Sequence, residues 1–404
     1  MQNIVIIGGG HAGAEACVAL RANGFEGRVH LFSDEPHPPY HRPPLSKGYL
    51  KTAPTLQPLQ PEAFYAEADI DLHLGVRVTD IDARAGRVFA SDGSEHAFDG
   101  MIYAAGSSAR RLPMPGGDSD NVHVVKTHDD GCRLAAALAA PGEVVVIGAG
   151  FIGLEVAASA AERGASVTVI DVAGQIMART ASAVVAATVQ RHHEAAGIRF
   201  RLGCAIEGFV TDGARVTGVT LKDDTILGAD HVVVGIGVTA NDDLARAAGL
   251  ATDDGVLVNA HLEASAPNVT AIGDCARFPS PFASVPLRLE SVQNATDQAR
   301  AAARTLLGYG VNYAEVPWFW SDQGTAKLQM AGIWSRDPHT IVRGTPEDGT
   351  LAAWHYVGER FAGVEAMNRA GDYMLGRRLL GGGVSPNPKH VADPDYDLKS
   401  YLRR

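Results

Sequence analysis

Apolar residues occur in short uninterrupted runs, and the clearest runs lead into glycines and then into a helical pattern. Residues 4–7 form such a run, a helix is predicted over about residues 14–23, and residues 28–32 form a second apolar strand. Continuous apolar strands are typical of parallel sheets that are covered on both faces. The chain is therefore predicted to open with a strand, a turn, a helix and a parallel strand.

The same order of elements occurs again after 142 residues. Apolar residues 144–147 precede a predicted helix that runs to about residue 163, and residues 166–170 form the next strand. Strands that alternate with helices in this way are typical of α/β folds. The repeat predicts two nucleotide-binding folds in one chain.

Both turns carry glycines at the spacing G-x-G-x-x-G. Glycine allows a tight turn and the close approach of backbone amides to a pyrophosphate, which the N-terminus of the next helix binds. Acidic residues follow the second strand of each fold, where a carboxylate binds ribose hydroxyls. Because a carboxylate repels a 2′-phosphate, Asp171 favours NADH over NADPH. The residues concerned are Gly8, Gly10, Gly13, Asp34 and Glu35 in the first fold, and Gly148, Gly150, Gly153 and Asp171 in the second.

Composition and charge narrow the class of protein. The 404 residues are 46 % hydrophobic and 20 % charged, and no apolar run reaches about 18 residues, so a membrane span is not expected. Residues 1–7 lead into a strand without the features of a signal peptide, which predicts a cytoplasmic protein. The net charge of −11 argues against a nucleic-acid partner.

The cysteines and histidines form no local metal or redox motif, so no metal site is predicted. A redox disulfide needs two close cysteines and an iron–sulfur cluster needs several thiolates at short spacing, so a partner would have to supply such a cluster. His192 and His193 are neighbours on a predicted helix and point to different faces, so we expect surface histidines. The scattered cysteines, which we expect to be buried, are Cys17, Cys132, Cys204 and Cys275.

Six longer motifs occur in order along nearly the whole chain. They are PPYHRPPLSKGYL (38–50), GAGFIGLE (148–155), VGIGVTAN (234–241), AIGDCA (271–276), LESVQNATDQA (289–299) and VPWFWSDQ (316–323). In this order they resemble the oxygenase-coupled NADH-dependent ferredoxin reductases. Members of that family are FAD enzymes that serve bacterial aromatic-ring dioxygenases and haem monooxygenases.

The resemblance implies an α/β fold with two Rossmann-like dinucleotide-binding domains of the glutathione reductase type and a C-terminal α+β domain. Residues 1–109 and 238–312 would form the FAD-binding domain, and residues 110–237 would form the NADH-binding domain inserted into it. Residues 313–404 would form the third domain, with strands over 327–333 and 352–357 and a helix over about 369–380.

The resemblance also implies roles for individual side chains. Lys47 and Glu155 would form a catalytic charge pair, and Trp320 would lie against the flavin. Lys126 and Val292 stand where family members commonly have Arg and Trp. Besides the glycines and acids named above, the implied cofactor-binding residues are His11, Ala12, Arg42, Lys47, Val78, Ala104, Ala105, Gly106, Lys126, Phe151, Ile152, Gly237, Gly273, Asp274, Ser291, Val292 and Trp320.

The implied reaction passes electrons from NADH through FAD, one at a time, to a separate [2Fe–2S] ferredoxin that serves a haem monooxygenase or a Rieske dioxygenase. Alternatives of the same fold are a rubredoxin reductase, an NADH oxidase or small-acceptor reductase, and a redox-switched interaction protein resembling apoptosis-inducing factor. A ferredoxin is commonly acidic, so a local cation patch would have to oppose the net negative charge of this chain. The candidate cations are Arg110, Arg111, Arg369, Arg377 and Arg378.

Overall fold

The computed structural model describes residues 1–334 and 338–403, which fall into two compact units. The first unit comprises residues Met1–His41, Leu56–Ser108 and Thr239–Pro317, and the second comprises Arg42–Thr55, Ala109–Val238 and Trp318–Arg404. The chain thus leaves the first unit three times. No helix in the part of the chain that the structure describes is both long and apolar enough to cross a membrane.

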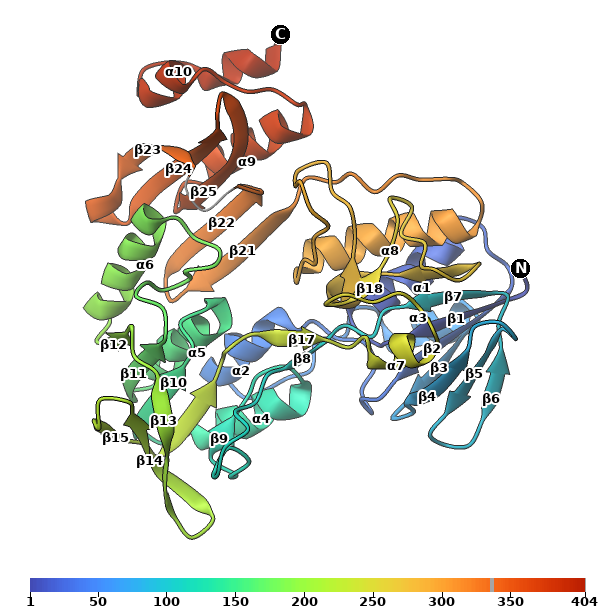
Figure 1. Ribbon diagram of the computed structural model, residues 1–404, viewed down its shortest axis with the longest axis horizontal. Helices are drawn as coiled ribbons and strands as arrows, with labels where there is room; N and C mark the ends of the chain where they lie inside the picture. The colour runs from blue at the N-terminus through green and yellow to red at the C-terminus, as the bar shows by residue number, and fades with distance from the viewer. Residues whose placement is uncertain (335–337, 404) are drawn as a thin grey trace. The chain divides into compact units, whose positions relative to one another are not determined.

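The first unit is built on a five-stranded parallel sheet in the order β19-β7-β1-β2-β3 (Figure 1). β1 pairs with β2 from Asn3 opposite Arg28 to Ile7 opposite Phe32, and the interior of β1 is fully buried. Helices α1 and α8 pack against each other. The elements are β1 Asn3–Ile7, α1 His11–Ala22, β2 Arg28–Ser33, α3 Glu62–Glu67, β3 Ile70–Leu74, β7 Gly100–Tyr103, α7 Asp243–Ala247, β19 Val269–Ala271 and α8 Val292–Leu306, with a small antiparallel sheet of β4 Val78–Asp82, β5 Arg87–Ala90 and β6 Glu95–Ala97.

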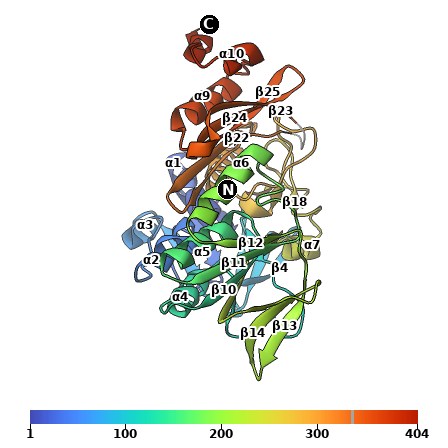
Figure 2. The same cartoon turned by 90° about the vertical axis from the view of Figure 1, so that its left-hand side faces the viewer.

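The second unit contains a parallel sheet of the same design, in the order β12-β11-β10-β16-β9. The hairpin of β13 and β14 extends away from this sheet (Figure 2). The elements are η1 Pro43–Ser46, α2 Gly48–Lys51, β9 Val122–His123, α4 His128–Ala137, β10 Glu143–Ile147, α5 Phe151–Glu162, β11 Ser166–Asp171, α6 Ala183–Ala195, β12 Arg199–Leu202, β13 Ile206–Asp212, β14 Arg215–Leu221, β15 Ile226–Gly228 and β16 His231–Val234.

An antiparallel sheet in the order β21-β22-β25-β24-β23 belongs to the same unit. Its buried side chains, such as Leu351 and Met367, join those of α5 and α6, such as Leu154 and Val185, in one hydrophobic core. β21 also contacts α5, which matters for the site below. The elements are β21 Trp318–Gln323, β22 Ala326–Gly332, β23 His339–Thr345, β24 Thr350–Val357, β25 Arg360–Met367, α9 Ala370–Gly381 and α10 Pro388–Ala392.

The mixed α/β fold class is confirmed, and the predicted strands and helices are present with small shifts at their ends. The first helix begins at His11 instead of about residue 14, because the glycine turn leads directly into it. The third-domain strands predicted over 327–333 and 352–357 are found at Ala326–Gly332 and Thr350–Val357. All four cysteines are free, and the prediction that they are buried is wrong for Cys132 and Cys204, which are half-buried.

Candidate functional site

The glycine turns after β1 and β10 have the same backbone geometry. Gly8 and Gly148 have φ of 119° and 108°, in the region that favours glycine. A Cβ on Gly8 would lie 2.1 Å from the carbonyl oxygen of Ala104, and one on Gly148 would lie 2.3 Å from that of Gly235. No side chain fits at either position. These two glycines are therefore required by the fold of the turn itself.

The third glycine of each motif allows the helix to approach the turn. A Cβ on Gly13 would lie 2.0 Å from the oxygen of Gly8, and one on Gly153 would lie 2.1 Å from the oxygen of Gly148. The close approach brings the first turns of α1 and α5 directly onto the ends of β1 and β10. The space around the middle glycine of the second turn, Gly150, is open.

The N-termini of α1 and α5 have the properties of anion-binding sites. Gly10 and Gly150 are the N-cap residues, neither provides a side-chain cap, and neither helix has an acidic residue in its first turn. By contrast, Thr127 caps α4 in a complete capping box. The first-turn amides of an uncapped helix carry partial positive charge and bind phosphate readily. Both turns therefore fit a dinucleotide pyrophosphate.

The acidic residues do not occupy equivalent positions in the two folds. Ile7 pairs with Phe32 and Ile147 pairs with Ile170, so Ser33 corresponds to Asp171 by register. The Asp171 carboxylate accepts hydrogen bonds from the backbone amides of Ala149, at 2.7 Å, and of Ala173, at 2.8 Å. It is thus held against the second glycine turn, where its remaining lone pairs can accept ribose hydroxyls.

The two acids of the first fold lie further along the chain and have other partners. Asp34 forms an exposed ion pair with Arg77 at 2.8 Å. Glu35 accepts a hydrogen bond from the Tyr40 hydroxyl at 2.6 Å. From the sequence motif, these acids and Asp171 were predicted to have the same role. The strand register shows that they lie at different positions, because Ser33 corresponds to Asp171.

Glu155 is the most deeply buried charge of the second unit's candidate site. Its side chain is 2 % exposed, and Lys47 Nζ lies 2.7 Å from Oε2. The Ser46 hydroxyl donates to the same oxygen at 2.6 Å, and the Ser321 hydroxyl donates to Oε1. A buried carboxylate is stable only when it is paired and hydrogen-bonded, and here both oxygens have donors. The predicted pairing of Lys47 with Glu155 is thus present.

A chain of buried hydrogen bonds continues from Glu155 to α6. Gln323 Nε2 donates to the Ser321 hydroxyl at 2.7 Å, and Gln323 Oε1 lies 2.9 Å from His193 Nε2. Because that amide oxygen can only accept, His193 carries its proton on Nε2. Burial lowers the pKa of His193 to about 4, so the ring is neutral near pH 7. The expectation of a surface histidine is wrong for His193, which is 1 % exposed and is hydrogen-bonded to Gln323 of β21.

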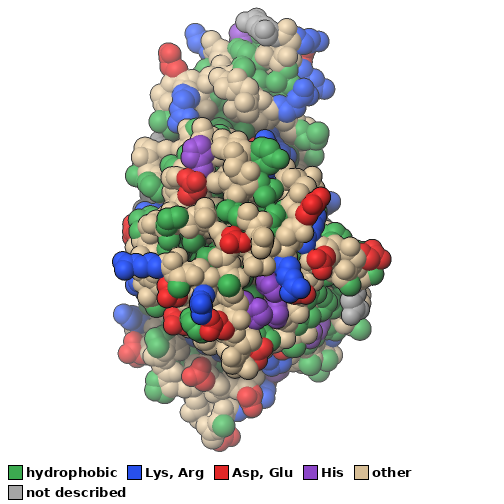
Figure 3. Space-filling model, turned by 90° about the vertical axis from the view of Figure 1, so that its right-hand side faces the viewer, with side chains coloured by type: hydrophobic (Ala, Val, Ile, Leu, Met, Phe, Trp, Pro, Cys, Tyr) green, Lys and Arg blue, Asp and Glu red, His purple; other side chains and the backbone are tan. Residues whose placement is uncertain are grey.

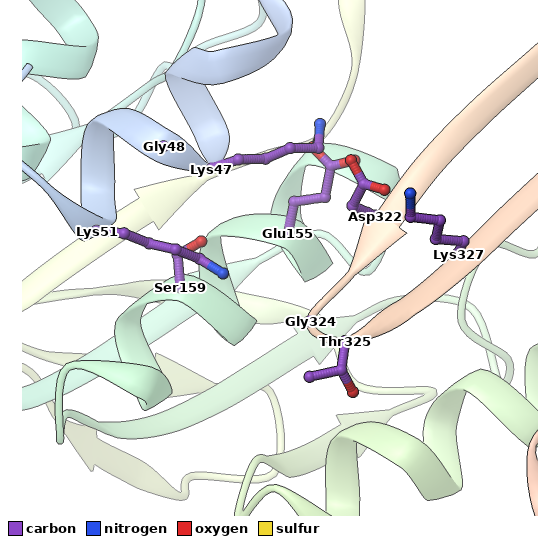
Figure 4. Close-up of a pocket in the computed structure, with 9 residues that line it drawn as sticks. All are labelled: Lys47, Gly48, Lys51, Glu155, Ser159, Asp322, Gly324, Thr325 and Lys327. Atoms are coloured by element: carbon purple, nitrogen blue, oxygen red, sulfur yellow. The ribbon is translucent and has the colours of Figure 1, made fainter. Parts of the chain in front are cut away.

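A pocket of about 370 Å³ opens beside the Lys47–Glu155 pair. Figure 4 shows the two side chains next to each other, with Asp322 and Lys327 reaching toward the same space from β21 and β22. The lining is rich in charge of both signs. It consists of Lys47, Gly48, Lys51, Glu155, Ser159, Asp322, Gly324, Thr325 and Lys327.

The remaining predicted residues divide between the two units. In the first unit, Asp274 accepts a hydrogen bond from the Ser107 hydroxyl at 2.6 Å, Ser291 caps α8, and Val78 is buried in the core. First-unit residues from the predicted set are Gly8, Gly10, His11, Ala12, Gly13, Asp34, Glu35, Val78, Ala104, Ala105, Gly106, Gly273, Asp274, Ser291 and Val292; those of the second unit are Arg42, Lys47, Lys126, Gly148, Gly150, Phe151, Ile152, Gly153, Glu155, Asp171, Gly237 and Trp320.

Three of the second-unit residues have defined surroundings. Arg42 donates to the backbone oxygen of Lys126 at 2.8 Å, which ties its guanidinium to the segment before α4. Trp320 lies beside Trp318 on β21, with their ring centroids 5.7 Å apart. Ser46, Ser321, Gln323 and His193 were not predicted; the only sequence signal for them is the i, i+2 spacing of Ser321 and Gln323, which places both on one face of a strand.

Comparison with known proteins matches this architecture. Residues 2–299 match the family described as pyridine nucleotide-disulphide oxidoreductase, and residues 318–402 match the one described as reductase C-terminal. The chain belongs to this oxidoreductase family. It is therefore an oxidoreductase of a family that uses FAD and NAD(P)H.

Individual relatives extend over the whole chain. Rhodocoxin reductase of Rhodococcus erythropolis is 41 % identical, with 100 % of this chain and 95 % of the relative covered. The ferredoxin reductase for the CYP199A2 system from Rhodopseudomonas palustris matches with a TM-score of 0.96 and 39 % identity over 99 % of each chain. The covalent putidaredoxin reductase–putidaredoxin complex contains a chain that matches with a TM-score of 0.95 and 36 % identity, over 100 % of this chain and 98 % of that one. The resemblance to ferredoxin reductases is confirmed.

Proposed function

We propose that this protein is an NADH-dependent ferredoxin reductase, which passes electrons from NADH through FAD to a [2Fe–2S] ferredoxin that serves a monooxygenase or a ring-hydroxylating dioxygenase. The observation that carries the proposal is the pair of uncapped helix N-termini after two glycine turns of the same geometry. Two dinucleotides need two such turns. The relatives with names of this activity, which match over nearly their whole length, support the choice of acceptor.

We assign FAD to the first glycine turn and NADH to the second. Asp171 supports NADH over NADPH, because its carboxylate is fixed at the end of β11 by two backbone amides. A 2′-phosphate in that position would meet a negative charge. The other predicted cofactor-binding residues of each unit stay assigned to these two nucleotides.

Bound FAD would take two electrons with a hydride from NADH and release them singly. The contribution of the chain is mainly to position groups, since hydride transfer needs the reacting atoms about 3–3.5 Å apart. We propose Lys47 and Glu155 as the charged pair that acts in this step. The Ser46 and Ser321 hydroxyls orient the Glu155 carboxylate, and Glu155 in turn holds the Lys47 ammonium in place.

We further propose that residues 1–109 and 238–312 form the FAD-binding domain, residues 110–237 the NADH-binding domain and residues 313–404 the C-terminal domain. The protein is proposed to act in the cytoplasm. For ferredoxin docking, the exposed side chains of Arg377 and Arg378 on α9 support a cationic surface, and the Arg377 guanidinium lies 4.7 Å from the ring centre of Trp318. Arg369 contributes less charge there, because it is paired with Asp372 at 2.7 Å.

The proposal is tested with the purified FAD-containing protein and NADH. A panel of [2Fe–2S] ferredoxins and a rubredoxin serve as acceptors, with oxygen and a small quinone as controls. At least one ferredoxin should be reduced much faster than the other acceptors. Faster reduction of rubredoxin, oxygen or the quinone would overturn the assignment of the acceptor. Rapid flavin reduction by NADH with no turnover on any acceptor would instead indicate a redox-switched interaction protein.

A further inference from the structure

Three histidines and one aspartate of the first unit converge on one face of the sheet. His30 lies on β2 opposite Asp71 on β3, and His73 follows two residues after Asp71. Residues two apart on a strand share a face, so His73 points to the same side as Asp71. His96 reaches this face from β6, a strand of the small antiparallel sheet. Figure 3, which views the molecule from the right-hand side of Figure 1, shows several histidine side chains near one another on that side of the molecule.

The donor atoms are spaced as metal ligands are. His30 Nδ1 lies 3.2 Å from His73 Nε2 and 3.3 Å from Asp71 Oδ2. Ligand atoms at about 2.0–2.1 Å in a tetrahedral zinc site lie about 3.3 Å apart, which matches both distances. One nitrogen from each of the three histidines falls within a mutual distance of 4.8 Å, so the His96 nitrogen lies at most about 1.5 Å beyond this spacing from either of the other two.

Hydrogen bonding alone does not satisfy this arrangement well. A single proton on His30 Nδ1 can bridge to His73 or to Asp71 but serves only one of them fully. If His73 instead donates to His30, the single lone pair of His30 Nδ1 is used in that bond and His30 Nδ1 has no proton for the Asp71 carboxylate 3.3 Å away. A divalent cation between the two rings can accept a lone pair from His30 and one from His73 at the same time, without a proton shared between them.

The surrounding residues hold the rings in place, as a metal site requires. Phe32 stacks on the His73 ring with centroids 4.2 Å apart and contacts the His96 ring edge-on at 5.1 Å. His96 Nε2 lies 3.0 Å from the Ser94 hydroxyl, which donates to Asp92 at 2.6 Å. When Nε2 donates to Ser94, the other ring nitrogen carries the lone pair. Hydrogen bonds of this kind, from the second ring nitrogen to an outer partner, are typical of metal-binding histidines.

We propose that His30, His73 and His96 bind one divalent metal ion of the zinc type, with Asp71, which lies beside His30 but outside the mutual distance of the three nitrogens, as the candidate fourth ligand. Solvent reaches the site, because the Asp71 side chain is 52 % exposed, whereas that of His30 is 11 % exposed. The ion would tie β6 to β2 and β3 and would take no part in electron transfer. Local sequence motifs do not reveal this set, because His73 follows His30 by 43 residues and lies on a different strand.

Titration calorimetry of the chelator-treated, FAD-containing protein with ZnCl₂ tests the proposal. The wild-type protein should bind one Zn²⁺ per chain. Loss of outer partners of a metal site costs about 10–100-fold in affinity, so loss of a ligand in His73→Gln or His30→Gln should cost at least about 100-fold. His339→Gln, which removes an exposed histidine of β23 in the second unit, is the matched control and should bind Zn²⁺ as the wild type does.

A second measurement does not depend on the folding of any variant. CoCl₂ added to the wild-type protein should give the intense visible bands of four-coordinate Co²⁺, and ZnCl₂ should abolish them. The FAD content of each variant shows whether it is folded. Absence of a 1:1 complex in the wild type, weak bands typical of six-coordinate Co²⁺, or equal affinity of a folded His73→Gln protein would overturn the site.

Discussion

The two nucleotide folds share a glycine turn but differ in the residue that faces it. In the first fold, Ser33 follows Phe32, the last residue of β2 that pairs with β1. A Cβ on Gly9 would lie 2.6 Å from the hydroxyl oxygen of Ser33. In the second fold the same position is Asp171, whose carboxylate accepts the amide of Ala149. Under the proposed assignment the turn would bind the pyrophosphate, while the next residue along the second strand would face the ribose. Selectivity between coenzymes can therefore change without any change to the turn.

The folds differ again in what covers their helices. In the second unit, β21 brings Ser321 and Gln323 onto α5 and α6, where they complete the hydrogen bonds of Glu155 and His193. The glycine turn of the second fold therefore stands next to a buried charge pair, Lys47 with Glu155. In the first unit, the hydroxyl of Ser291 accepts a hydrogen bond from the amide of Asn294 and caps α8. The buried charge pair is thus a feature of the second unit, to which we assign NADH.

The largest effect is expected when a side chain is introduced into one or the other glycine turn. Gly13→Ala should abolish FAD retention, because its Cβ would lie 2.0 Å from the oxygen of Gly8. Gly153→Ala, with the equivalent clash at 2.1 Å, should leave FAD bound and slow flavin reduction by NADH by more than about 100-fold. Flavin absorbance and stopped-flow reduction measure the two effects. Gly371→Ala on α9, where the space is open, is the control; loss of FAD in Gly153→Ala alone would reverse the assignment of the two turns.

Lys47→Met tests whether the buried charge pair matters for the reaction. The variant leaves the Glu155 carboxylate, which is 2 % exposed, without its cation. We expect the activation free energy of flavin reduction to rise by about 3 kcal/mol, which corresponds to a rate about 100-fold slower. Arg87→Met removes an exposed pair with Glu95, outside this pocket, whose side chains are 53 % and 44 % exposed, and should cost less than about 1 kcal/mol. Stopped-flow rates that are equal in the two variants would remove Lys47 from the mechanism.

Acid should weaken the second unit through His193. The folded pKa of about 4 lies below the ordinary value of 6.5, so the unfolded chain takes up a proton that the folded chain does not. Stability is therefore lost as the pH falls from about 6.5 to 4, by about 3 kcal/mol from this group. His193→Gln, unlike His192→Gln, should flatten the dependence of urea unfolding on pH over this range. A slope that His193→Gln leaves unchanged would assign the acid sensitivity to other groups, such as His123, whose pKa burial also lowers to about 4.

A change of coenzyme preference should follow from Asp171→Arg, through the loss of the carboxylate at the ribose. The ratio of kcat/KM for NADPH to that for NADH should rise by about 10–100-fold, since a guanidinium binds a 2′-phosphate. Asp34→Arg makes the same charge change in the first fold and should leave the ratio as it is. If Asp171→Arg does not move the ratio, Asp171 does not meet the ribose.

The smallest effect concerns the electron acceptor. Because both proteins are net acidic, docking through Arg377 and Arg378 should make ferredoxin reduction about tenfold slower between low and physiological salt. Reduction of the flavin by NADH should barely change over the same range. A flat salt profile with an active ferredoxin would point to apolar docking near Trp318 and Trp320.

Local sequence was sufficient for the features that depend on neighbours along the chain. The strands, glycine turns and helices follow from apolar runs and from positions that only glycine can occupy. The Lys47–Glu155 pair follows from family resemblance. Features that depend on register or packing were missed. The correspondence of Ser33 with Asp171 requires the strand pairing, and the burial of His193 requires Gln323, which lies 130 residues away.

The insertion of one fold within another has a consequence for the order of synthesis. β7 ends at Tyr103, but its partner β19 begins only at Val269, so the first sheet lacks an edge while the intervening chain is made. At about 5–20 residues per second this interval lasts on the order of 8–33 s. All five strands of the inserted parallel sheet, which ends at Val234, are synthesised within that time. On the ribosome, the parallel sheet of the second nucleotide fold can therefore be completed before the parallel sheet of the first fold.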